Sequence, residues 1–118
     1  MHNKESQLAS LNARREIVKG EMFSALSRIQ DDRYSALADQ VHDTKDQAIA
    51  QLLAESGNAD LQRAANELQD IDAALQRINA GTYGRCRDCG IEIPSSRLAA
   101  YPTAKRCLPC QELHEKNR

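Results

Sequence analysis

The strongest constraint on the fold is a pair of identical cysteine motifs near the end of the chain. All four cysteines lie in two C-x-x-C pairs, Cys86/Cys89 and Cys107/Cys110, with residues 90–106 between the pairs. Two thiolates three positions apart can grip one edge of a tetrahedral metal site when a tight turn lies beside them, and Gly90 suits such a turn. The spacing predicts one structural Zn²⁺, because a closed set of four cysteine ligands leaves no coordination position open for catalysis.

Other uses of these residues stay open on the sequence alone. The thiols can be unligated and buried, or they can form redox dithiols, although neither motif follows a strand in a βαβ pattern. His114 follows Cys110 by four positions and is an alternative ligand, and His2 and His42 are weaker ones. We expect zinc bound by the four cysteines.

The composition limits what surrounds the cysteines. Aromatic residues make up 3% of the 118 residues and tryptophan is absent, which favours helices over a large mixed core. No apolar run approaches the roughly 20 residues needed to span a bilayer, and the first residues lack the apolar stretch of a signal peptide. We therefore expect a cytoplasmic protein with no membrane contact, in which disulfides are disfavoured.

Apolar residues before the cysteines repeat with helical spacing. From residue 61 the spacing alternates strictly between three and four, which is a heptad seam. A looser stripe runs through the N-terminal segment and predicts a second long helix. Backward from Leu61 the seam continues more loosely through Ile49, Leu53 and Ala54, and Gly57-Asn58 interrupts it, so we expect a kink or fraying of that helix there. The seam consists of Leu61, Ala64, Leu68, Ile71, Leu75 and Ile78, and the first stripe includes Leu8, Leu11, Val18, Met22, Ala25 or Leu26, Ile29, Leu37 and Val41.

The two helices are expected to pack against each other with a reversal near residues 40–48. The stripe lapses there, and Thr44 followed by Gln47 supplies a capping-box pattern. Gly81 stands where a left-handed residue would end the second helix. The predicted fold is mostly α: a long antiparallel two-helix coiled-coil hairpin over 1–81, with its tip near 42–47, followed by a small four-cysteine zinc-finger module over 82–118 with a short C-terminal helix.

The cysteine region resembles the zinc finger of the DksA/TraR family of bacterial RNA-polymerase regulators. The spacing of Ile93, Arg97 and Pro102 between the two cysteine pairs agrees with that family's signature. The resemblance implies a zinc finger with four cysteine ligands beside a coiled coil whose tip carries a D-x-x-D-x-A motif. At the family's offset from Cys86 this chain reads Asp43-Thr44-Lys45-Asp46-Gln47-Ala48.

The resemblance also implies a function without chemistry of its own. In the family the hairpin enters the secondary channel of RNA polymerase, so Asp43, Asp46 and Ala48 are expected to act near the polymerase active centre and to change promoter-complex stability. Taken alone, Asp43 is better explained as a helix cap and Asp46 as a first-turn carboxylate, roles that a polymerase contact does not preclude. We expect a monomeric, non-enzymatic regulator that binds core polymerase.

The family's ppGpp-binding positions are degenerate in this chain. They read Arg63, Glu67, Asp70 and Gln111, of which only Arg63 is basic. Carboxylates repel a polyphosphate, so we expect weak or no potentiation of this protein by ppGpp.

Two rival functions follow from the same residues. One is a DNA-binding zinc module, but residues 1–81 carry nine basic against thirteen acidic side chains, and residues 82–118 seven against four. Neither part has the strongly basic surface with stacking aromatics that nucleic-acid binding favours, so we expect no direct DNA binding. The other is Mg²⁺-dependent transcript cleavage at Asp43 and Asp46, although two carboxylates alone bind Mg²⁺ weakly.

Overall fold

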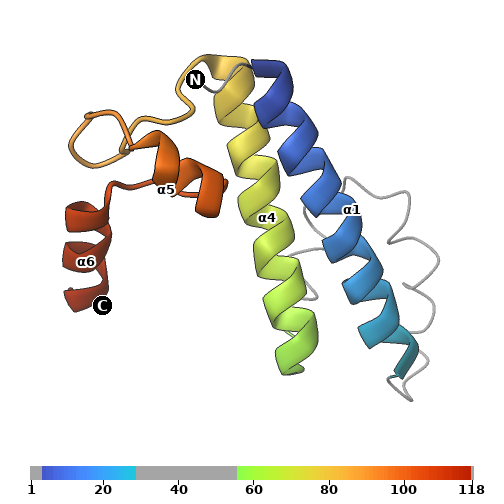
Figure 1. Ribbon diagram of the computed structural model, residues 1–118. Helices are drawn as coiled ribbons and strands as arrows, with labels where there is room; N and C mark the ends of the chain where they lie inside the picture. The colour runs from blue at the N-terminus through green and yellow to red at the C-terminus, as the bar shows by residue number, and fades with distance from the viewer. Residues whose placement is uncertain (1–3, 29–55, 118) are drawn as a thin grey trace. The chain divides into compact units, whose positions relative to one another are not determined.

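The computed structural model describes residues 4–28 and 56–117, and within them the regular structure is helical. The helices are α1 (Lys4–Arg28), α4 (Ala59–Ala80), α5 (Ser95–Ala100) and α6 (Leu108–Lys116), coloured from blue to red in Figure 1. One isolated antiparallel bridge joins Arg85 to Glu92. The chain divides into two compact units, which we call the finger unit (Met1–Leu11 with Ile71–Arg118) and the helix-pair unit (Asn12–Asp70). None of the described helices is apolar over a stretch long enough to cross a membrane.

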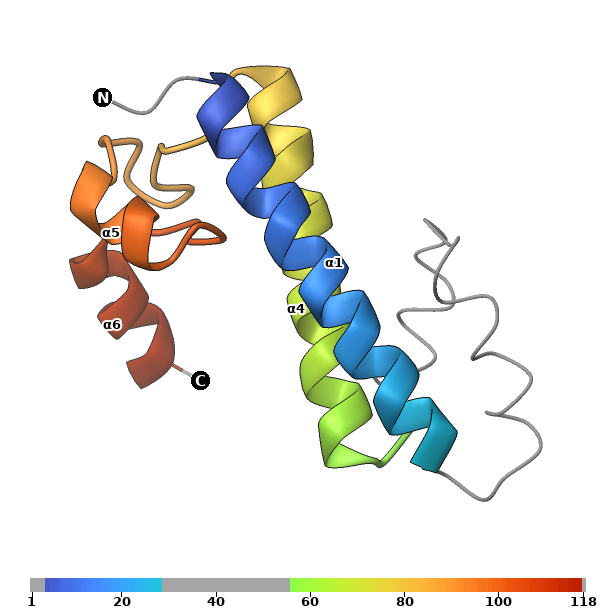
Figure 2. The same ribbon diagram turned by 45° about the vertical axis from the view of Figure 1, so that its right-hand side comes forward.

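The helix-pair unit contains residues 12–28 of α1 and residues 59–70 of α4, which lie side by side in opposite directions (Figure 2). Arg14 on α1 makes a two-pronged ion pair with Glu67 on α4, and its second hydrogen bond, from Nη2 to Oε1, measures 2.8 Å. Near the other end of α1, Arg28 lies 3.6 Å from the Asp60 carboxylate. Because higher numbers on α1 pair with lower numbers on α4, the two helices are antiparallel, as the sequence predicts.

The buried residues confirm the predicted seams. On α4 five of the six seam positions are buried, and Leu75 is half-buried. The two helices bury small residues as well, Ala65 and Ala74 among them, which allow the backbones to approach closely. The predicted stripe on α1 is buried at Leu11, Val18, Met22, Ala25 and Leu26, while Leu8 is half-buried. Ile29, Leu37 and Val41 lie outside the described residues.

Two basic residues on α1 are buried without having been predicted. Arg15 lies on the same face of α1 as Leu11 and Val18 and is 8% exposed. Lys19, the residue after Val18, is 6% exposed. Long basic side chains bury their aliphatic stems along apolar surface, so a count of apolar residues overlooks them. The Nζ of Lys19 lies 3.7 Å from the Glu16 carboxylate one turn earlier.

At Gly57, where the sequence analysis expects a kink or fraying, residues 56–58 are not helical. Helix α4 begins at Ala59, and the chain bends at Ser56 and Gly57, where Gly57 has a φ of 83°. A left-handed backbone of this kind cannot continue a right-handed helix. The Gly57-Asn58 signal therefore marks a bend followed by the start of α4.

The end of α4 follows the sequence prediction. Gly81 has a φ of 78°, its N–H donates to the Ile78 carbonyl, and the N–H of Thr82 donates to the Arg77 carbonyl at 2.9 Å. This is the Schellman pattern, which satisfies carbonyls that the last helical turn leaves free. The motif turns the chain directly into the cysteine region.

Candidate metal centre

The first cysteine pair lies in a tight backbone knuckle. The N–H of Cys86 donates to the Ile91 carbonyl at 2.8 Å, and the N–H of Gly90 donates back to the Cys86 carbonyl at 3.0 Å. Gly90 has a φ of 81°, which a side chain would strain. The predicted turn after Cys89 is therefore present, and it brings the sulfurs of residues 86 and 89 to the same side of the loop.

The second pair lies at the start of α6. Cys107 is the N-cap residue in an extended conformation, with φ −66° and ψ 163°, and its carbonyl accepts the N–H of Gln111 at 2.9 Å. Pro109 stands in the first turn, where its missing N–H costs nothing. The first turn of α6 lies between Cys107 and Cys110 and brings their two thiols close together.

The four thiols converge. All four sulfur atoms lie within 4.8 Å of one another, and none forms a disulfide. The Sγ atoms of Cys89 and Cys107 are 3.7 Å apart. A tetrahedron with Zn–S bonds of about 2.3 Å has edges of about 3.8 Å. The donor set and its spacing thus fit one Zn²⁺ ion, and the chain can close all four coordination positions without help.

The electrostatics of the thiols favour a cation among them. Burial acts to raise the pKa of the Cys86 thiol, but backbone hydrogen bonds from Cys89, Cys107 and Asp88 lower it to about 6. The pKa of Cys110 is raised, chiefly because the neighbouring thiols of Cys107, Cys86 and Cys89 disfavour another negative charge. The Cys86 sulfur is therefore ready to ionise while Cys110 resists doing so, a conflict that a bound divalent cation removes.

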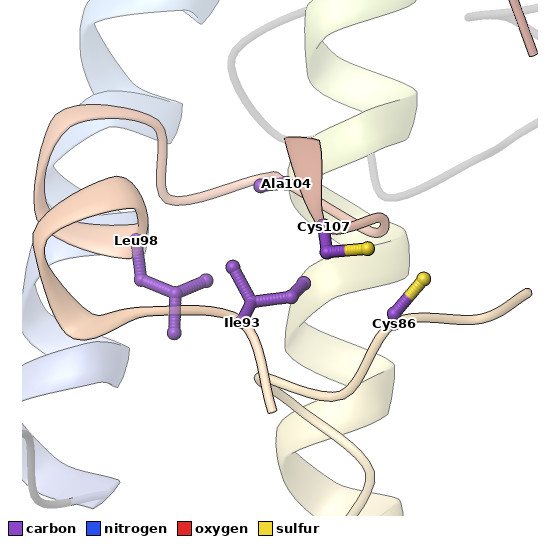
Figure 3. Close-up of a cluster of buried hydrophobic side chains, with 5 residues drawn as sticks. All are labelled: Cys86, Ile93, Leu98, Ala104 and Cys107. Atoms are coloured by element: carbon purple, nitrogen blue, oxygen red, sulfur yellow. The ribbon is translucent and has the colours of Figure 1, made fainter. Parts of the chain in front are cut away.

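A small apolar cluster supports the sulfurs from one side. It consists of Cys86, Ile93, Leu98, Ala104 and Cys107, all less than 10% exposed (Figure 3). In Figure 3 the two sulfurs lie at one end of the cluster and Leu98 at the other, with Ile93 between them. The partly buried side chains of Tyr83 and Cys110 pack against it. A core of this size buries little surface, so a metal cross-link supplies stability that packing alone does not provide.

Two tertiary hydrogen bonds tie this cluster to the end of α4 within the finger unit. The Tyr83 hydroxyl donates to the Pro102 carbonyl at 2.8 Å, and Nη2 of Arg77 donates to the Thr103 carbonyl at 3.4 Å. Burial raises the pKa of Tyr83, while the positive charge of Arg77 acts in the opposite direction.

The other predicted site residues have different surroundings. His114 is exposed on α6, and His2 and His42 lie outside the described residues. Asp43, Asp46 and Ala48 also lie outside them. Arg63 is exposed on α4, and its guanidinium lies 3.5 Å from the carboxylate of Asp60. Arg106, directly before Cys107, is buried, and sequence reasoning missed it because arginine is a residue type that is usually exposed.

Comparison with known proteins identifies the cysteine region independently. The family model described as the prokaryotic dksA/traR C4-type zinc finger matches residues 81–116. An uncharacterised protein of Aquifex aeolicus is 49% identical over 49 residues, which is 42% of this chain and 34% of that protein. The matched part of the family model contains all four cysteines, and its start coincides with the Gly81 helix end.

Similarity also extends beyond the cysteine region. The RNA polymerase-binding transcription factor DksA of Caulobacter vibrioides is 33% identical over 108 residues, covering 90% of this chain and 71% of that protein. The solved structure of the transcription factor DksA2 from Pseudomonas aeruginosa covers 97% of this chain and 81% of its own, with 31% identity and a TM-score of 0.50. The similarity therefore includes both helices of the pair as well as the metal centre.

Proposed function

Because the chain belongs to the DksA/TraR family of C4-type zinc-finger proteins, we propose that it is a transcription regulator that binds RNA polymerase. The observation that carries the proposal is the similarity to an RNA polymerase-binding factor over 90% of the chain, helices and cysteines together. A match confined to the zinc finger would support only a shared metal site. A match that includes the helix pair supports a shared way of acting.

The metal part of the proposal assigns all four ligands. Cys86, Cys89, Cys107 and Cys110 hold one Zn²⁺ ion, which when bound offsets part of the thiolate charge and cross-links the two motifs. The knuckle and the first turn of α6 present the sulfurs, and the apolar cluster excludes water from one side of them. With four protein ligands the site has a structural role.

The hairpin part of the proposal concerns residues 1–81. The antiparallel course of α1 and α4 supports a hairpin, because the chain must reverse between residues 28 and 59. That stretch contains the D-x-x-D-x-A motif at 43–48. We place the tip near 42–47 and the zinc-finger module at 82–118. A slender helical hairpin can pass through a narrow channel that a globular domain cannot enter.

The tip is the acting element in this proposal. Asp46, supported by Asp43 and Ala48, reaches the polymerase active centre through the secondary channel and alters the lifetime of promoter complexes. In such a confined site of low dielectric, a carboxylate interacts with nearby charges more strongly than it does in bulk water. The protein performs no chemistry of its own.

The partners follow from the same reasoning. The protein acts as a cytoplasmic monomer on core polymerase and makes no specific contact with DNA. It responds weakly or not at all to ppGpp, because Arg63 is the one basic residue among the degenerate positions and its charge is already engaged within the helix-pair unit. Glu67 is held by Arg14, and Arg63 shares the Asp60 carboxylate with Arg28.

The test is the variant Asp46→Asn, which keeps the size of the side chain and removes its charge. We expect unchanged zinc content and helicity, normal binding to core polymerase, and loss of the effect on promoter-complex lifetime. Asp39→Asn, an acidic residue of the same stretch outside the motif, is the matched control and should behave as wild type. If both variants regulate normally, the tip aspartate has no part in the mechanism.

A further inference from the structure

Arg106 connects the two cysteine motifs through its side chain. Its Nε donates a 2.8 Å hydrogen bond to Oδ2 of Asp88, and the side chains are 8% and 43% exposed, respectively. Asp88 lies between Cys86 and Cys89, whereas Arg106 directly precedes Cys107. The ion pair therefore bridges the two segments that carry the two cysteine pairs.

Backbone contacts show that this bridge is part of a larger arrangement. The N–H of Arg87 donates to the Lys105 carbonyl at 2.9 Å, one residue from each member of the ion pair. The Arg106 carbonyl in turn accepts Nε of Arg97, from α5, at 3.3 Å. Arg106 thus uses its side chain to hold the first motif and its carbonyl to hold α5.

Burial distinguishes this pair from an ordinary surface ion pair. An exposed pair fixes little, because two mobile side chains gain modest attraction in water. Here the guanidinium is almost fully buried, so its direction is set by packing, and removing its partner leaves a desolvated charge. The pair therefore has a fixed geometry that can orient the loop bearing Asp88.

The charge of the metal centre gives the pair a second effect. Four thiolates around one Zn²⁺ carry a net charge of about −2. The Asp88 carboxylate stands in the sequence between two of these thiolates, where it adds to their repulsion. The Arg106 cation offsets that carboxylate. Loss of Arg106 consequently harms metal binding more than loss of Asp88 does, because it leaves an unbalanced carboxylate beside an anionic site.

We propose that Arg106 and Asp88 are positioning residues that set the zinc affinity of the protein by holding the two cysteine pairs at tetrahedral spacing. The inference rests on the zinc ligation assigned under the proposed function and is independent of polymerase binding. Partners outside the ligand shell commonly contribute 10- to 100-fold to metal affinity. The backbone bond between Arg87 and Lys105 remains in any side-chain variant, so the centre is weakened and not abolished.

The test measures the zinc dissociation constant of the full chain by competition with a chromogenic chelator. Arg106→Met keeps the aliphatic stem and removes the charge, and we expect it to weaken zinc binding about 10- to 100-fold. Asp88→Asn is expected to weaken binding by a smaller factor, since its amide oxygen still accepts the Arg106 hydrogen bond. The double variant should bind zinc more tightly than Arg106→Met alone, because it no longer carries the unbalanced carboxylate.

Conservative replacement separates positioning from space filling. Arg106→Lys restores the charge and should recover part of the affinity that Arg106→Met loses. If Arg106→Met binds zinc as well as Arg106→Lys, the side chain only fills space and the inference is overturned. The controls are Arg87→Met and Glu92→Gln, which change exposed charges of the same module and should stay within about twofold of wild type, well below the 10-fold effect.

Remaining outcomes are equally decisive. The Asp88 side chain is 43% exposed, so Asp88→Ala, which removes the acceptor of the Arg106 hydrogen bond, should fold, and wild-type affinity in that variant overturns the inference even if Arg106→Met fails to fold. The Co²⁺-loaded variants should keep the absorption of a four-thiolate site, because the ligands are unchanged. If the wild-type chain itself binds no zinc, the metal centre of the proposed function is wrong. If the wild-type chain binds zinc and the variants bind it equally well, only the inference about Arg106 and Asp88 is wrong.

Discussion

The Oδ1 atom of Asn58 accepts a 3.1 Å hydrogen bond from the backbone N–H of Leu61, and this contact fixes the start of α4. The N–H of Asn58 itself donates to Oγ of Ser56 at 3.2 Å, so the turn before the helix is closed from both sides. Asn58 satisfies one of the donors that every helix start leaves free. The start of α4 is therefore fixed at Ala59 by side-chain hydrogen bonds of the two polar residues before it.

Removing this cap should lower the stability of the protein. Asn58→Ala is expected to reduce the free energy of unfolding by about 0.5–2 kcal/mol, because no side chain then accepts the Leu61 N–H. Urea unfolding followed by circular dichroism measures the change. Asn66→Ala, the same replacement at an exposed position inside α4, is the control. It should be neutral or slightly stabilising, since alanine has the higher helix propensity. Equal losses in both variants would contradict the cap.

Two glycines should respond to alanine with opposite signs. An added Cβ meets no heavy atom within 4 Å at either Gly20 or Gly57, so crowding plays no part. Gly20 lies inside α1, and Gly20→Ala should raise the free energy of unfolding by about 0.5–1 kcal/mol. Gly57 has a φ of 83°, where alanine is strained, so Gly57→Ala should lower the free energy of unfolding by about 1–2 kcal/mol. Parallel thermal unfolding of both variants checks the contrast, and changes of the same sign would contradict it.

The ligand set can be tested one residue at a time. Serine in place of Cys86, Cys89, Cys107 or Cys110 should reduce bound zinc below one equivalent per chain, because a hydroxyl is a poor zinc ligand. His114→Ala should retain one equivalent, since that side chain is exposed on α6 and is not among the four converging ligands. Zinc content by elemental mass spectrometry gives the answer. Retention by Cys110→Ser with loss by His114→Ala would assign the fourth ligand to histidine.

The Tyr83 hydroxyl should make the stability pH-dependent in alkali. Its pKa is raised above the ordinary value of 10.0 by burial, so above that pH the unfolded chain ionises first. The contribution of the neutral Tyr83 hydroxyl to the free energy of unfolding is fully present below pH 10 and is lost as the pH rises through the raised pKa. Tyr83→Phe should cost about 0.5–1.5 kcal/mol at neutral pH, through loss of the bond to Pro102, and should flatten the alkaline decline. An unchanged decline in that variant would show that another group is responsible.

Much of this molecule could be predicted from local sequence patterns. The period of the α4 seam, the glycine at its end and the spacing of the cysteines each depend on residues close in sequence, and the structure confirms all three. The apolar spacing alone shows Asn58 as an interruption and does not reveal it as a helix cap, because a cap and a kink leave the same signature in that spacing. Arg15, Lys19 and Arg106 were missed since their burial depends on partners distant in sequence. The Arg106–Asp88 pair spans 18 positions, and no periodicity encodes such a contact.

The central claim is that residues 43–48 reach the polymerase active centre, and localised hydroxyl-radical cleavage tests it most directly. Fe²⁺ replaces Mg²⁺ in the active centre of core polymerase bound to this protein, and the radicals it releases cut whichever part of the chain lies nearby. The account predicts cuts confined to the neighbourhood of Asp43 and Asp46, lost when a Gre-type factor, an unrelated transcript-cleavage protein with a similar hairpin, competes for the channel. Cuts within the zinc-finger module, or a bound protein that is not cut at all, would contradict it.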